Sequence, residues 1–148
     1  MSVAQDFEAD HAEPIVRPGP SRRRAAAVLT AMAGAMVLWI IADPVGGIDL
    51  TVSSAASARN IGPGAVAVVS GLAGLAAVGL AALLARLTAR ARSIWHVVAV
   101  TILVLSLTGP LGAVTAGAGV TLAAMHVVVG ATLIVGIGRT VSARRVSQ

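Results

Sequence analysis

The sequence predicts an all-α membrane protein in which four transmembrane helices form an up-down bundle, with both termini in the cytoplasm. Its composition is 57% hydrophobic and 11% charged, with a mean hydropathy of +0.90, which lies outside the range of a soluble domain of 148 residues. Residues 93–138 contain no Asp, Glu, Lys or Arg. Because one crossing takes roughly 20 apolar residues, this run is long enough for two helices.

The N-terminal half supplies the other two spans. Residues 1–24 are polar and rich in acidic side chains, Pro and Arg, so we expect a disordered cytoplasmic tail. An apolar segment at 25–42 follows and ends before Asp43. The next one, at 63–85, begins with a proline, which the first turn of a helix tolerates. Both segments are predicted to cross the membrane.

The uncharged C-terminal run divides near its middle, at the Gly-Pro-Leu-Gly sequence 109–112. Proline has no amide proton and glycine favours turns, so a helix ends there. The sequence therefore predicts spans over 94–108 and 114–137. Residues 25–139 form the transmembrane domain of this interpretation, and 140–148 form a basic cytoplasmic tail.

The connection 43–62 is the longest between the predicted spans. Residues 48–52 alternate like a short strand, but no partner strand is evident, and a lone strand is unstable. We therefore expect an ordered loop or an interfacial turn.

The positive charges indicate the orientation. All eleven are arginines, and ten of them flank the cytoplasmic ends of the predicted spans, which leaves only Arg59 outside. Cytoplasmic loops of membrane proteins carry an excess of Arg and Lys, so we expect a plasma-membrane protein with both termini inside. Topology thereby accounts for the basic charge, and nucleic acid is not an expected partner.

The chain has no tyrosine and two tryptophans. The four-span layout puts Trp39 near the outer edge of the first helix and Trp95 near the inner edge of the third. Indole rings anchor helices at these depths, so both are expected at the membrane interfaces.

Small residues recur four positions apart, which aligns them on one helix face and lets backbones approach closely. They are Ala27, Ala31 and Ala35, then Ala67 with Gly71, Ser70 with Gly74, and Gly119 with Ala123. Of these, Gly71, Gly74 and Gly119 are the predicted packing glycines. Packing within the bundle is the favoured interpretation, and a homo-oligomer interface is the alternative.

His126 is the polar residue most deeply placed in a predicted span, roughly 18 Å from either end at 1.5 Å per residue. Ionisable groups at this depth are costly and often functional. Two interpretations stay open: a neutral imidazole bonded within the bundle, or a role with a proton, ligand or cofactor. His96 differs in depth by roughly 15 Å, so the two histidines are not expected to share a haem.

Three further polar residues, Asp43, Asp49 and Arg59, lie at the outer rim. They could pair with one another, bind a cation or a partner, or simply be solvated. The spans contain no Asp or Glu between their ends, which argues against cation-coupled transport. No hydrolase, zinc-protease or nucleotide-binding motif is present, so we expect no catalytic residue, no cofactor and no metal.

Several short motifs resemble those of small actinobacterial four-span membrane proteins that are catalogued as a domain of unknown function. They are Asp43-Pro44, Asp49-Leu50-Thr51-Val52, Ile61-Gly62-Pro63-Gly64-Ala65-Val66-Ala67, Leu105-Ser106-Leu107-Thr108-Gly109-Pro110-Leu111 and His126. The resemblance covers about 25–139. It implies the four-span layout and supplies no catalytic residue.

The sequence thus favours a non-enzymatic accessory or structural membrane subunit that acts through helix contacts. Its partners would be the lipid bilayer and another membrane protein or a second copy of the chain. An alternative is a small transporter or permease subunit using His126 and Asp43. A third interpretation is a redox subunit associated with a quinone or a haem.

Overall fold

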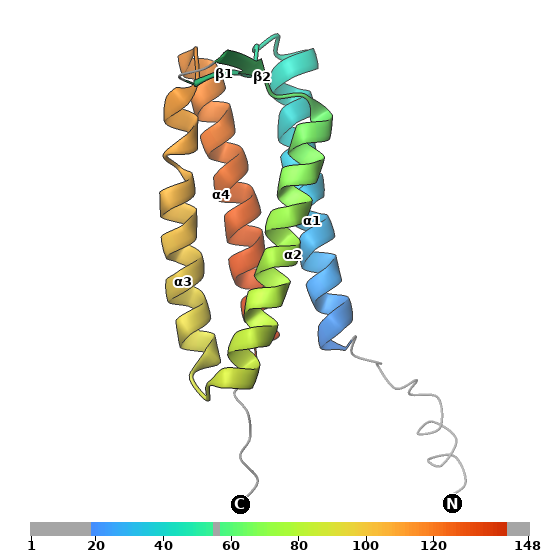
Figure 1. The fold of residues 1–148 in the computed structure, drawn as a ribbon. Coiled ribbons are helices and arrows are strands. Elements are labelled where there is room, and N and C mark those ends of the chain that lie inside the picture. The colour runs from blue at the N-terminus through green and yellow to red at the C-terminus, as the bar shows by residue number, and fades with distance from the viewer. Residues whose placement is uncertain (1–18, 55–56, 142–148) are drawn as a thin grey trace, which may run out of the picture.

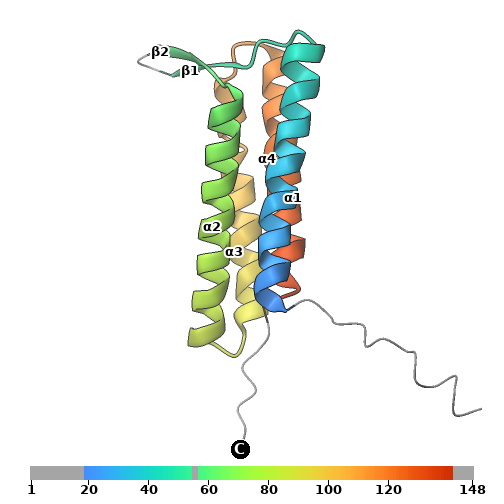
Figure 2. The ribbon, with the colours of Figure 1, turned by 90° about the vertical axis from the view of Figure 1, so that its right-hand side faces the viewer.

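The computed structural model describes residues 19–54 and 57–141, and it confirms the predicted all-α bundle (Figures 1 and 2). In this part of the chain, four helices are long and apolar enough to cross a membrane. They are α1 (Pro20–Ile40, continued by a π-helical turn, Ile41–Val45), α2 (Pro63–Leu87), α3 (Ala91–Ser106, followed by the 3-10 turn Gly109–Gly112) and α4 (Ala116–Gly138).

The helices run alternately up and down around a ring. α1 packs against α2 and α4, and α3 packs against the same two helices, so α1 and α3 occupy opposite corners. The start of α1, the α2–α3 connection and the end of α4 lie together at one end (Figure 1). We call this the arginine end, because the described arginines other than Arg59 lie there: Arg22, Arg23, Arg24, Arg86, Arg90, Arg92 and Arg139. The opposite end is called the hairpin end.

The first helix starts earlier than predicted. α1 begins at Pro20, so the last residues of the predicted tail 1–24 are helical. The tail boundary at residue 24 is therefore wrong: arginine is a good helix former, and Pro20 stands at a position where a missing amide costs nothing. Residues 1–18 and 142–148, which make up most of both predicted tails, lie outside the described residues.

The connection 43–62 contains a β-hairpin, not the predicted loop or turn. β1 (Thr51–Ser54) pairs antiparallel with β2 (Ser57–Asn60). The partner strand lies within the same connection, and its polar residues lack the alternation that marks a strand. Asp49 ties the base of the hairpin together, because one of its carboxylate oxygens accepts hydrogen bonds from Thr51 and Asn60 at 2.6 and 2.8 Å.

An apolar plug closes the hairpin end. Leu50 is fully buried and packs with Leu122 and Met125 of α4. Trp39 fixes the start of α2, since its indole N–H donates to the carbonyl of Ile61 at 2.9 Å. These contacts anchor the base of the hairpin to the bundle, and the hairpin itself projects sideways from this end (Figure 2).

Trp95 does not act as the predicted interfacial anchor. It is only 2% exposed, and its N–H donates to the carbonyl of Ile134 in α4 at 3.2 Å. The ring is directed inward because it packs over Gly138, where a side chain would meet it. Trp95 is thus part of the core at the arginine end.

α1 packs closely against its neighbouring helices. Ala31 and Ala35 are buried, and a Cβ added at Gly74 of α2 would lie 2.6 Å from Val28 Cγ1. The other two predicted packing glycines are less crowded. A Cβ at Gly71 would lie 3.5 Å from Met32, and one at Gly119 would lie 3.5 Å from the Pro110 carbonyl oxygen, so both have room.

Replacing Gly74 by leucine is expected to lower the free energy of unfolding by about 1–3 kcal/mol, because the new side chain overlaps Val28 and forces α1 away from α2. Gly79→Leu is the matched control, since a Cβ there meets no described atom within 4 Å. Both changes alter helix propensity equally, and unfolding in detergent measures the difference. Equal stabilities would show that α1 and α2 do not pack as described.

Candidate functional site

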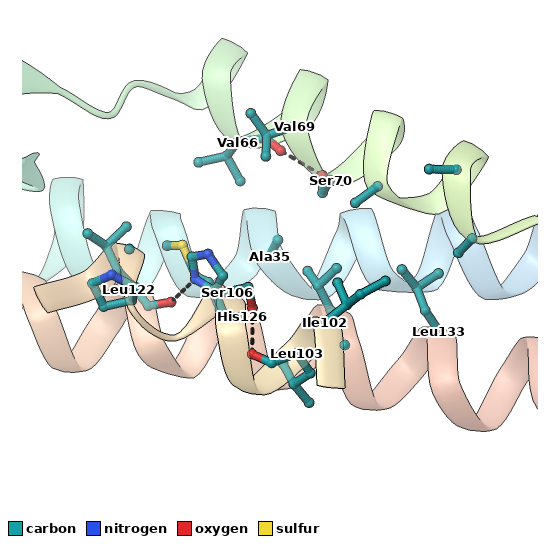
Figure 3. A pocket seen from close by; sticks show the side chains of 18 of the residues that line it. Ala35, Val66, Val69, Ser70, Ile102, Leu103, Ser106, Leu122, His126 and Leu133 are labelled. Atoms are coloured by element: carbon teal, nitrogen blue, oxygen red, sulfur yellow. Dashed lines mark hydrogen bonds between the residues drawn. The ribbon is translucent and has the colours of Figure 1, made fainter. Parts of the chain in front are cut away.

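A cavity of about 840 Å³ lies between α2, α3 and α4 and reaches Ala35 of α1 (Figure 3). Along α2 it extends from Ala65 to Leu80, about 22 Å at 1.5 Å per residue. The hydrocarbon core of a bilayer is about 30 Å thick, so the cavity spans much of that depth. Its volume falls within the usual range of ligand sites, roughly 300–1,000 Å³.

The cavity results from the way α3 is attached. α2 and α3 meet at their connection and spread apart toward the hairpin end (Figure 1). α3 is also the least buried span, because only 11% of its most apolar stretch is buried inside the bundle. The inner faces of α2 and α3 carry small residues at this level, including Ala73, Ala77 and Ala99, so the separation is not filled.

The lining is almost entirely apolar. Of the described residues that form it, five carry a nitrogen or oxygen in the side chain: Arg59, Ser70, Trp95, Ser106 and His126. Arg59 comes from β2 and lies at the hairpin end, whereas the other four come from the helices. Among the described residues, the only charged one in the lining is therefore at one end of the cavity.

His126 stands midway along α4 and faces this cavity. Its Nδ1 lies 2.7 Å from the carbonyl oxygen of Leu122, one turn earlier (Figure 3). A carbonyl only accepts hydrogen bonds, so Nδ1 carries the proton and donates it. The other ring nitrogen, Nε2, makes no hydrogen bond to a described residue.

The three other polar side chains that the helices contribute to the cavity lining donate hydrogen bonds to backbone carbonyls. Ser70 Oγ donates to Val66 at 2.6 Å, and Ser106 Oγ donates to Leu103 at 2.7 Å (Figure 3). Trp95 donates to Ile134. In hydrocarbon every polar group needs such a partner, and these bonds provide it within the protein.

The predicted rim residues separate into two sites. Asp43 and Asp49 line a shallow hollow beside the hairpin with Gly47, Ile48 and Asn60, whereas Arg59 lines the main cavity. His126 is not part of the rim hollow, so the structure does not bring His126 and Asp43 into one site. Within residues 19–54 and 57–141, no group of three His, Cys, Asp or Glu side chains could hold a metal ion.

His96 does not line the cavity. It lies near the arginine end of α3 beside Gly138, and its Nδ1 donates to the carbonyl of Arg92 at 2.8 Å. The two histidines therefore do not face a common space.

Sequence reasoning missed the cavity and one glycine that shapes it. A Cβ at Gly130 of α4 would lie 2.6 Å from Leu103 of α3, so Gly130 sets the closest approach of these helices. Gly130 has no small residue four positions before it, where His126 stands, so the spacing rule does not select it. The signal in the sequence that could have selected Gly130 is its position one helical turn after His126.

The model of a family described as "Family of unknown function (DUF6069)" matches residues 16–143. The chain belongs to this family. No curated protein and no solved structure gives a significant match to the chain. The family match includes all four helices, the hairpin and the residues that line the cavity, so the cavity lies within the family domain.

Proposed function

We propose that this member of the family is a non-enzymatic plasma-membrane protein that takes a lipid molecule from the bilayer into the cavity between α2, α3 and α4. The observation that carries the proposal is an apolar cavity about 22 Å long within helices that are themselves apolar outside. A chain-shaped apolar molecule lying parallel to the helices matches that length and lining. The bilayer is its immediate source.

The shape of the cavity favours a lipid over a partner helix. A helix needs a diameter of about 10–12 Å along its whole length, whereas α2 and α3 approach one another toward their connection (Figure 1). An acyl chain needs far less room. Arg59 at the hairpin end of the cavity supports the same choice, because an anionic lipid headgroup lying there would meet a guanidinium.

An accessory role is the second candidate, and it rests on the outer face of α3. Val97, Val104 and Leu105 are each at least 60% exposed on this least buried span. A partner helix could pack on that face without entering the cavity. The transporter alternative receives no support from the geometry, because His126 and Asp43 line separate hollows.

We further propose that the arginine end faces the cytoplasm. Seven described arginines lie at this end and one lies at the other, which is the bias that fixes orientation in membranes. Arg24 illustrates how they are held, since its Nε donates to the Thr140 hydroxyl at 2.9 Å and joins the start of α1 to the end of α4. The hairpin then lies outside.

The first experiment tests this orientation, and the absence of cysteine makes single labels clean. Ala58→Cys in the hairpin should react with an impermeant maleimide in intact cells. Ala89→Cys in the α2–α3 connection should react only after permeabilisation. Both sites are exposed, so accessibility within the protein is matched. The reverse labelling pattern would overturn the proposed orientation.

The second experiment tests lipid binding. Wild-type protein purified in mild detergent is expected to retain a lipid in native mass spectra. Ala77→Phe should retain several-fold less, because its ring fills the cavity. Ala131→Phe is the control: it adds the same ring on α4 at an exposed position outside the cavity lining. Equal retention by all three proteins, or none by the wild type, would contradict the proposal.

A further inference from the structure

We infer that the cavity selects a lipid whose hydrocarbon chain carries a hydroxyl group, which donates a hydrogen bond to Nε2 of His126. This inference rests on the proposed lipid binding and adds the chemical class of the ligand. It follows from which hydrogen-bonding groups of the cavity are already used and which are left.

His126 carries a proton on Nδ1. Because Nδ1 donates to the Leu122 carbonyl at 2.7 Å, a neutral ring must hold its lone pair on Nε2. Every buried side-chain nitrogen or oxygen of the described residues has a hydrogen-bond partner. Nε2 has none, so it is not buried and can be reached from the cavity that His126 lines. In Figure 3 it faces the space between α4 and α2. The cavity thus presents a hydrogen-bond acceptor there.

The described groups at this depth offer no competing hydrogen-bond donor. The hydroxyl protons of Ser70 and Ser106 are directed to the carbonyls of Val66 and Leu103, and the indole proton of Trp95 is directed to Ile134. The serine oxygens retain only lone pairs. Arg59, the remaining donor side chain of the lining, is at the hairpin end. The helical part of the cavity therefore offers acceptors alone.

His126 lies deep within its membrane-spanning helix. His126 lies about 15 Å from the start of α4 and about 18 Å from its end, hence near the middle of the hydrocarbon layer. A hydroxyl group on a lipid chain has no partner at that level of the bilayer and is costly there. Moving the chain into the cavity supplies that partner. A ketone, or the ring of an oxidised quinone, carries only acceptors and gains nothing from Nε2.

The test compares three octadecanoic acids that differ at mid-chain, carrying a hydroxyl group, a keto group or no substituent. Each displaces a fluorescent fatty acid from purified protein in detergent. Wild type should bind the hydroxyl acid about tenfold more tightly than the keto acid. In His126→Phe, which keeps an aromatic ring without an acceptor, this ratio should fall to about one. His96→Gln, which changes a histidine outside the cavity lining, should retain the ratio.

A spectroscopic readout separates this role from a structural one. In ¹⁵N NMR spectra of wild type, the Nε2 signal of His126 should be that of an unprotonated nitrogen and should shift with the hydroxyl acid but not with the keto acid. The chain has three histidines, so the signal is assigned by its loss in His126→Phe. Equal affinities for hydroxyl and keto acids, or an unchanged Nε2 signal, would overturn the inference while lipid binding stands. If none of the acids displaces the probe, the proposed function fails as well.

Discussion

The structure depends on how helices associate when they are surrounded by lipid. Exposed apolar side chains gain nothing from meeting one another there, so packing of small residues must hold the bundle together. α1 provides this packing through buried Ala31 and Ala35, and it approaches α2 at Gly74 and α4 at Gly136, where an added Cβ would lie 2.6 Å from the facing side chain. α3 lacks an equivalent face. It touches α4 closely at Gly130 but separates from α2, and the cavity is the space that remains.

The same solvent constrains the polar groups. A hydroxyl or imidazole proton in hydrocarbon must find an acceptor, and the nearest is the carbonyl one turn back on its own helix. Ser70, Thr101 and His126 all donate to the carbonyl four residues earlier. These local bonds satisfy each side chain without joining α2 to α3, so they leave α3 free to separate from α2. They also leave lone pairs exposed in the cavity, which makes its lining selective.

Much of the fold was predictable because its determinants are local. Charge-free runs and the break at Pro110 defined the spans, and their length required a bilayer. The hairpin was missed because its second strand, Ser57–Asn60, has no alternation and is stabilised by Asp49 and the packing of Leu50. The cavity was missed for another reason. Small residues indicated close packing, which is correct for Gly74, yet Ala73 and Ala77 on the same helix line empty space. Only the distance between α2 and α3 in the folded structure tells the packed small residues from those that line the cavity. His126, by contrast, could be selected from the sequence by its depth in the span.

Quenching of Trp95 by brominated lipids tests most directly whether this cavity admits acyl chains from the bilayer. Trp95 lines the cavity but is 2% exposed, and Trp39→Phe leaves it as the sole tryptophan. In vesicles of lipids brominated along their chains, Trp95 fluorescence should be strongly quenched, and adding Ala77→Phe should reduce the quenching while Ala131→Phe should not. Quenching that is absent, or equally strong in the filled cavity, would contradict a lipid-accessible site between α2 and α3.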